Sequence, residues 1–102
     1  MITVITPTYK RHQYLKNAID SVLNQTYKGF ELIVVDDNPA GSKERALTEE
    51  VMKGVTDPRV VYIQNEQNLG GAGSRNRAIE MAKGEYIAFL GVVLSAALDY
   101  ES

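Results

Sequence analysis

The chain has 102 residues, which fits one domain of modest size that is long enough to bury a core. Hydrophobic residues make up 44% and charged residues 24%, which is typical of a globular protein and not of a disordered chain. The net charge of −2 argues against a nucleic-acid partner, because phosphate binding needs clustered lysine and arginine. The absence of cysteine excludes disulfides and thiolate metal sites.

The N-terminal residues lack the basic segment and the long apolar run of a signal peptide, so we expect a cytoplasmic location. The longest stretch without charge, residues 86–98, is shorter than the about 20 residues that a membrane helix needs.

The first third of the chain alternates strand and helix signals. A β-branched run at residues 2–5 predicts a strand that ends at Pro7, because proline cannot donate to a ladder. Apolar residues at helical spacing predict an amphipathic helix over residues 12–25. A nearly continuous apolar run at residues 31–36 predicts a strand that is covered on both faces.

The alternation continues with weaker signals, which predict a helix over 42–54, a strand over 59–63, a helix over 72–83 and a strand over 85–90. Gly84 is the natural C-cap of the last helix. The residues expected to face inward are Leu47, Val51, Met52 and Val55 in the earlier of these two helices, and Ala72, Ile79 and Ala82 in the later one.

The charged residues of the helix over 42–54 suit a solvated face with ion pairs between successive turns. They are Lys43, Glu44, Arg45, Glu49 and Glu50.

The order β-α-β-α-β-α-β predicts an α/β fold, a single Rossmann-like domain over residues 1–102 with a mostly parallel sheet. Ligands of such sheets bind beyond the carboxyl ends of the strands, near the point where the strand order reverses. The residues that follow the predicted strands are 6–9, Asp36 and Asp37, and 65–71, and they are the first candidates for a site.

Each of these segments allows a functional and an ordinary interpretation. A rigid proline turn at residues 6–9 presents an aromatic ring to a flat ligand, or simply ends a strand. Of the paired carboxylates, one can cap the next turn while the other accepts hydrogen bonds from a base or ribose; the alternative is an Asx-turn beside a solvated aspartate.

The glycine-bearing loop at residues 65–76 either exposes backbone N–H groups to a phosphate, with Arg75 nearby, or is a flexible loop that leads into a helix. It is neither a dinucleotide fingerprint, because its third glycine is missing, nor a P-loop, because no Gly-Lys-Ser/Thr occurs.

Six short segments, in this order along the chain, resemble those of family 2 glycosyltransferases of the GT-A fold. They are VITPTYKR (4–11), IDSVLNQTY (19–27), FELIVVDD (30–37), NEQNLG (65–70), SRN (74–76) and GEYIAFL (84–90). Each segment is weak by itself, whereas the ordered set over residues 2–90 is specific.

The resemblance implies transfer of a sugar from a nucleoside diphosphate sugar, of the UDP type, to a hydroxyl or amine with inversion at the anomeric carbon. It places Pro7 and Tyr9 at the nucleobase, Asp37 at the base or ribose, and Arg75 near the diphosphate, whereas Asp36 can instead be structural. The substrate-binding residues expected from it are Pro7, Thr8, Tyr9, Asp36, Asp37 and Arg75.

The chain departs from the family after the fourth predicted strand. The family carries aspartates there that hold Mg²⁺ or Mn²⁺ on the diphosphate, whereas residues 91–93 read Gly-Val-Val and cannot bind a hard cation. Residues 91–102 therefore form an atypical tail, and we expect the acceptor-binding half and the catalytic base beyond residue 102. These departures predict no metal ligand, no catalytic residue and no activity of this part alone.

The apolar stretch over residues 86–98 predicts self-association, because sheet and helix surface that nothing covers seeks a partner. Two other functions stay open: a non-catalytic α/β binding or regulatory fragment that self-associates, and a phospho-receiver domain. The second lacks the acidic pair that receivers carry after their first strand. By the same resemblance, longer relatives are expected close to a membrane.

Overall fold

The computed structural model describes residues 1–24 and 29–90, and the predicted atypical tail at 91–102 lies outside the described residues. None of the described helices is long and apolar enough to cross a membrane. The elements are β1 (Ile2–Thr8), α1 (His12–Leu23), β2 (Phe30–Asp36), α2 (Lys43–Lys53), β3 (Val60–Gln64), α3 (Gly70–Met81) and β4 (Tyr86–Phe89).

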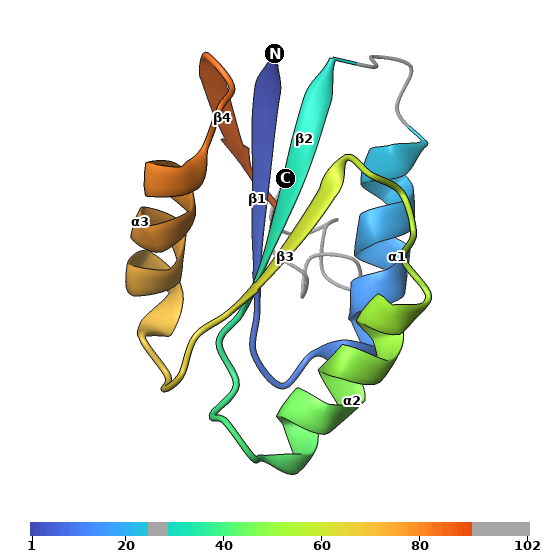
Figure 1. The fold of residues 1–102 in the computed structure, drawn as a ribbon, viewed down its shortest axis with the longest axis vertical. Coiled ribbons are helices and arrows are strands. Elements are labelled where there is room, and N and C mark those ends of the chain that lie inside the picture. Colours follow the sequence, from blue (N-terminus) through green and yellow to red (C-terminus); the bar gives the residue numbers. More distant parts are fainter. Residues whose placement is uncertain (25–28, 91–102) are drawn as a thin grey trace, which may run out of the picture.

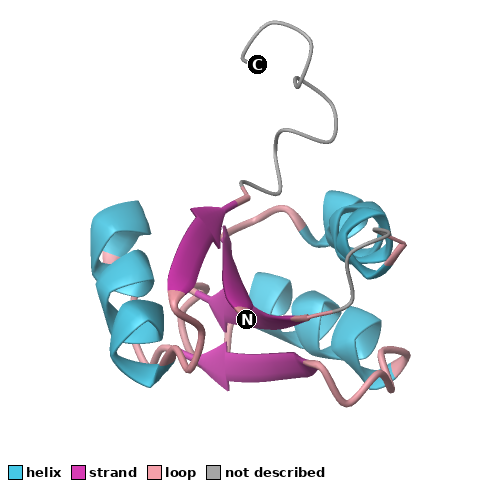
Figure 2. Ribbon diagram, turned by 90° about the horizontal axis from the view of Figure 1, so that it is seen from above, coloured by secondary structure: helices cyan, strands magenta, loops and turns pink. Residues whose placement is uncertain are grey.

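The four strands form one parallel sheet in the order β3-β2-β1-β4. Helices α1 and α2 cover one face and α3 covers the other, so the molecule has three layers (Figures 1 and 2). The predicted α/β class, the order of elements and the parallel sheet are confirmed. The chain passes from β1 to β2 and β3 on one side and then returns to β4 on the other. The strand order therefore reverses between β1 and β4.

The side chains of β2 alternate between the two layers of helices. Leu32 and Val34 pack in the core that contains residues of α1 and α2, whereas Ile33 and Val35 pack with Ala78 of α3. All four are at most 1% exposed, which explains the continuous apolar run in the sequence. Because the period of a strand is two, the same alternation extends to the carboxylates that follow.

The prediction that β1 ends at Pro7 is wrong, since the strand runs to Thr8 and Pro7 pairs in register with Val35. Ile2 N–H donates to Gly29 of the β2 side and Ile5 C=O accepts from Leu90 of the β4 side. By this alternation the nitrogen of Pro7 faces the β4 side, beyond the last residue of β1 that pairs with β4. No ladder hydrogen bond is lost there, so proline is tolerated within the strand.

The inward face predicted for the third helix is also wrong. Its buried residues are Ser74 and Ala78, whereas Ile79 is 39% exposed. Helix α3 starts two residues earlier than predicted, at Gly70, and its contact with the sheet is made through small side chains. A sequence whose buried face consists of serine and alanine carries almost no hydrophobic periodicity.

Gly84 does not cap α3, which ends at Met81 with an extended Ala82 after it. It serves the entry into β4 instead, where its N–H donates to Thr3 Oγ1 at 2.9 Å. A Cβ atom at this position would lie 2.7 Å from both N and Oγ1 of Thr3. The glycine is thus required by the close approach of the segment before β4 to Thr3 of β1.

Candidate functional site

The ends of β1, β2 and β3 and the start of α3 meet at the carboxyl edge of the sheet. The sequence-predicted residues Pro7, Thr8, Asp36 and Asp37 all lie there, because in the parallel register Thr8 pairs with Asp36 and Asp37 N–H donates to Thr8 C=O. This edge is where parallel α/β sheets bind ligands. The structure thus brings together residues that are far apart in the sequence.

Asp36 faces α2 and is fully buried. Its Oδ2 accepts the Tyr62 hydroxyl at 2.5 Å and lies 3.1 Å from Arg45 Nε, whose direction makes this an ion pair and not a hydrogen bond. Its Oδ1 accepts the backbone N–H and the side-chain amide of Asn38 at 3.0 and 2.8 Å. A buried carboxylate with this many partners ties β2, β3 and α2 together, which suits a structural role.

Arg45 was predicted on a solvated face of α2, and that prediction is wrong, since it is 7% exposed. Its Nη2 donates to the backbone carbonyls of Asn38, at 2.6 Å, and of Asn65. The guanidinium therefore ties the loop after β2 to the loop after β3. Sequence reasoning missed it because a charged residue on an amphipathic helix normally points to solvent.

Tyr62 supplies the hydroxyl that closes the Asp36 cluster. Burial, followed by the hydrogen bond to Asp36, raises the pKa of the Tyr62 hydroxyl well above its usual range. The protonated form is the one that donates to the carboxylate, so folding favours it.

Asp37 faces the other way, toward α3, and is 3% exposed. Its Oδ1 accepts from Asn65 Nδ2 at 2.8 Å and from Leu69 N–H at 2.7 Å. Its Oδ2 accepts from Asn68 Nδ2 at 2.7 Å and from Gly70 N–H at 2.9 Å. Each carboxylate oxygen thus has two donors, and all four come from residues 65–70, which lead from the end of β3 into the first residue of α3.

These contacts decide what the glycine-bearing loop exposes. The N–H groups of Leu69 and Gly70 stand at the start of α3, where a phosphate would accept hydrogen bonds, and both donate to Asp37. A phosphate at this helix end would meet only the groups that Asp37 leaves free.

Asn65 and Asn38 belong to the site, although the sequence interpretation assigned a role to neither of them. Asn65, 1% exposed, donates to Asp37 and to Ser74 Oγ, and its Oδ1 accepts from Arg77 Nη1 at 2.5 Å. Asn38, fully buried, accepts the backbone N–H of Lys10 at 2.9 Å. A signal existed, since Asn65 directly follows β3 and Asn38 lies two residues after the end of β2.

The Asn38 contact holds the loop after β1. Lys10 has a φ of 55°, a left-handed conformation that is uncommon for a residue with a side chain. Its ammonium lies 5.2 Å from the centroid of the Tyr9 ring. Tyr9 remains 41% exposed beyond the end of β1.

The predicted site residues differ in their access to a ligand. Pro7 and Arg75 are half-buried and Tyr9 is exposed, whereas Thr8, Asp36 and Asp37 are buried. The guanidinium of Arg75 lies 5.7 Å from the centroid of Phe89 on β4 and forms no hydrogen bond or ion pair with the residues that the structure describes. Arg75 therefore retains its donors, beside the strand that flanks the reversal point.

The described residues do not fit the metal that the family resemblance implies. Within residues 1–24 and 29–90, no group of three or more histidine, cysteine or acidic side chains could hold a metal ion. The two acidic residues at this edge, Asp36 and Asp37, face opposite layers, and their carboxylate oxygens accept hydrogen bonds from protein donors. The sequence-predicted departure at residues 91–93 lies outside the described residues.

Replacing Tyr62 with phenylalanine tests the structural role of Asp36. We expect Tyr62→Phe to lower the free energy of unfolding at pH 7 by about 1–2 kcal/mol, because a buried carboxylate loses a donor. Since the pKa of Tyr62 is raised in the fold, unfolded tyrosine ionises first, so this difference should shrink above about pH 10. Urea unfolding of both proteins from pH 7 to pH 11 measures it; equal stability at pH 7 would contradict the role.

Comparisons with known proteins agree with this architecture. The model of glycosyl transferase family 2 matches residues 3–92. An uncharacterized glycosyltransferase of Methanocaldococcus jannaschii, MJ1057, is 42% identical over 91 residues, which cover 88% of this chain and 31% of the relative. The chain thus spans about a third of the length of the curated relatives it matches.

Solved structures give the same picture. S. aureus TarS 1-349 in complex with UDP-GlcNAc is similar with a TM-score of 0.74 and 29% identity, over 97% of this chain and 30% of that one. The mannosyltransferase PcManGT of Pyrobaculum calidifontis, solved with GDP-Man and Mn²⁺, shares the fold at a TM-score of 0.74 and 23% identity, over 89% of this chain and 27% of that one. The extent of the family match and these likenesses show that the chain belongs to glycosyl transferase family 2.

Proposed function

We propose that this chain carries the donor-binding part of an inverting glycosyltransferase and that it holds the nucleotide of a UDP-type sugar. The supporting observation is that Pro7 and Tyr9 lie at the carboxyl end of β1 while Arg75 lies beside Phe89 at the carboxyl end of β4, and the strand order reverses between these two strands. The TarS structure, 29% identical to this chain, holds UDP-GlcNAc.

Each accessible group has a chemistry that suits one part of the donor. The exposed ring of Tyr9 offers a stacking surface to a nucleobase, and the fixed backbone of Pro7 shapes the floor beside it. Arg75 keeps its guanidinium free of ion pairs with described residues, and a planar fork of N–H donors matches a diphosphate.

The proposal assigns binding and no catalytic step to this chain. Inversion needs a base that activates the acceptor, and none of the six predicted site residues is placed as one. The carboxylates of Asp36 and Asp37 are held by protein donors, so neither stands free to take a proton from an acceptor. We therefore propose that this part binds the donor without completing a transfer by itself.

Isothermal calorimetry with UDP, GDP, ADP and CDP tests donor binding. We expect UDP to give the strongest signal, and Tyr9→Ala and Arg75→Ala each to weaken it by about tenfold, the loss expected for one stacking or charged contact. Both side chains reach the surface, so neither change should unfold the protein.

Lys53→Ala is the matched control, because it removes an exposed cation at the far end of α2, where Lys53 forms an ion pair with Glu50. Its UDP affinity should equal that of the wild type. If no nucleoside diphosphate binds, or if all three variants bind as the wild type does, the proposed site is wrong.

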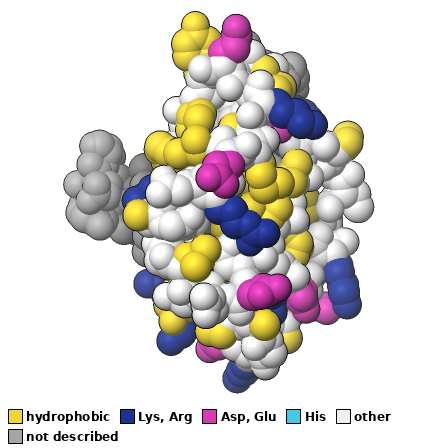
Figure 3. Space-filling model, turned by 60° about the vertical axis from the view of Figure 1, so that its left-hand side comes forward, with side chains coloured by type: hydrophobic (Ala, Val, Ile, Leu, Met, Phe, Trp, Pro, Cys, Tyr) yellow, Lys and Arg dark blue, Asp and Glu magenta, His cyan; other side chains and the backbone are white. Residues whose placement is uncertain are grey.

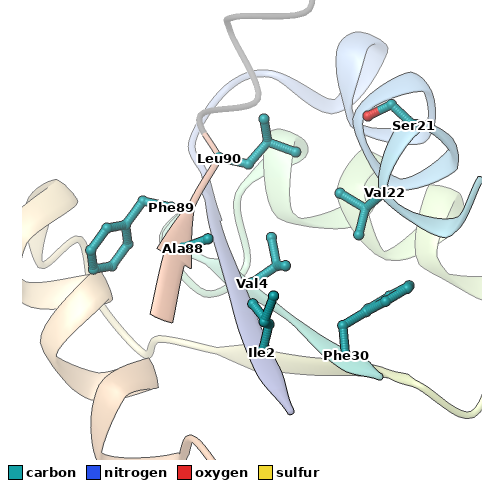
Figure 4. A pocket seen from close by; sticks show the side chains of 8 residues that line it. All are labelled: Ile2, Val4, Ser21, Val22, Phe30, Ala88, Phe89 and Leu90. Carbon is teal, nitrogen blue, oxygen red and sulfur yellow. The ribbon is translucent and has the colours of Figure 1, made fainter. Parts of the chain in front are cut away.

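We also propose that β4 mediates self-association of this part by pairing with the same strand of a second copy. All four residues of β4 are exposed, Tyr86 by 69% and Phe89 by 53%, and among the described residues the strand pairs with β1 alone. On the α1 side, Ala88 and Leu90 border an apolar pocket that reaches Val4 and Phe30 (Figure 4). Figure 3 shows further hydrophobic side chains exposed among isolated charges on the side of α3. β4 contains neither a charged residue nor a proline, which natural proteins place on edge strands to prevent pairing with another chain.

Light scattering over a concentration series tests the pairing of copies through β4. We expect the mean mass to rise with concentration in the wild type and to stay monomeric in Tyr86→Lys, because a lysine opposes edge pairing. Thr56→Lys, an exposed change beside β3 at the other edge, should behave as the wild type. A monomeric wild type at high concentration would rule out the association.

A further inference from the structure

We propose that Arg45 is a positioning residue that fixes the distance between the two ends of the donor site, one at Tyr9 and the other at Arg75. This inference rests on the proposed donor site and refines it, because it adds a residue of α2 that is buried beneath that site. Arg45 is 7% exposed, so any effect that it has on nucleotide binding passes through the groups that it holds.

The guanidinium of Arg45 joins the main chains of two loops. Its Nη2 donates to the carbonyl of Asn38, in the loop after β2, at 2.6 Å, and to the carbonyl of Asn65, which directly follows β3. Its Nε lies 3.1 Å from the carboxylate of Asp36, which balances the buried charge. A planar guanidinium makes such contacts in several directions at once, whereas a lysine ammonium is a compact point charge.

Asn38 extends the first of these contacts to the end of β1. Its Oδ1 accepts the backbone N–H of Lys10 at 2.9 Å, and Lys10 is the chain neighbour of Tyr9. Its Nδ2 donates to Thr48 Oγ1 at 3.2 Å, so α2 holds the side chain of Asn38 as well as its carbonyl. The backbone that presents Tyr9 is thereby fixed to α2.

Asn65 extends the second contact to the start of α3. Its Nδ2 donates to Ser74 Oγ at 3.0 Å, and its Oδ1 accepts from Arg77 Nη1 at 2.5 Å. Ser74 and Arg77 lie on either side of Arg75 in the helix. The helical turn that bears Arg75 is therefore fixed to the same guanidinium as the loop that bears Tyr9.

A fixed distance matters to a ligand that uses both ends of the site. In the proposed site the base of UDP contacts Tyr9 and its diphosphate contacts Arg75, so both contacts form at full strength only when the two groups are held at the spacing of the nucleotide. Uridine has no phosphate and uses the Tyr9 end alone, where Thr48 still holds Asn38 in the absence of Arg45. Loss of the two carbonyl contacts should therefore weaken UDP more than uridine.

Arg45→Lys tests this difference, because it keeps a cation beside Asp36 and removes the bridge between the two carbonyls. We expect it to weaken UDP by about tenfold, measured by calorimetry, and uridine by less than about twofold, measured by NMR titration. Tyr62→Phe is the matched control, since it takes a donor from the same Asp36 cluster and leaves both carbonyl contacts in place. It should bind both ligands as the wild type does.

Unchanged UDP binding by Arg45→Lys, or equal losses for UDP and uridine, would overturn the inference. An equal loss of UDP affinity in Tyr62→Phe would also overturn it, because the effect of Arg45 would then be one of stability alone. If Arg45→Lys does not fold, Ser74→Ala takes its place, since it breaks the next contact along the same path, between Asn65 and α3. The same difference between UDP and uridine is expected of it, and equal losses would again contradict the inference.

Amide hydrogen exchange without nucleotide keeps this test separate from the proposed function. Two backbone bonds join the same pair of loops: Asn65 N–H donates to Asp36 C=O at 2.8 Å, and Ala40 N–H donates to Glu66 C=O at 3.4 Å. We expect both N–H groups to exchange about tenfold faster in Arg45→Lys and close to the wild-type rate in Tyr62→Phe. If UDP fails to bind the wild type, the donor site is wrong, and these rates still decide whether Arg45 holds the two loops together. Wild-type rates in Arg45→Lys would show that it does not.

Discussion

Neighbouring residues of a β-strand point to opposite faces of the sheet, and this constraint organises the carboxyl edge of the molecule. Asp36 and Asp37 are adjacent in the chain, yet one faces α2 and the other faces α3. Each is buried, and each collects donors from its own layer. The pair therefore anchors two networks, which Arg45 links through its hydrogen bond to the Asn65 carbonyl, and together they join the loops that follow β1, β2 and β3.

The two networks divide the edge into a fixed interior and an accessible rim. The interior consists of buried polar groups that bind one another: Asp36 pairs with Arg45, and Asp37 accepts from Asn65. Tyr9 and Arg75 lie outside both networks: Tyr9 is exposed, and the guanidinium of Arg75 has no hydrogen bond or ion pair within residues 1–24 and 29–90. Such a division suits donor binding, because groups that contact a ligand work best when the backbone beneath them is rigid. It also explains why several predicted site residues are buried while they lie beside the accessible ones.

Much of the fold follows from patterns that the sequence carries openly. The apolar run in β2 and the helical spacing in α1 each arise from packing against a hydrophobic core, so they predict their elements well. The failed predictions have a common physical cause. Helix α3 packs through serine and alanine, and Gly84 is needed where the backbone approaches Thr3. Arg45 is buried because it donates hydrogen bonds to the carbonyls of Asn38 and Asn65. Contacts between residues distant in the chain leave no local period. The site's position after the strands was predictable, whereas the donors that occupy its carboxylates were not.

The most direct test of this account is a crystal structure of the chain grown with UDP. We expect uracil against Tyr9 and Pro7 and the diphosphate at Arg75. A nucleotide bound away from the carboxyl edge of the sheet would contradict these assignments.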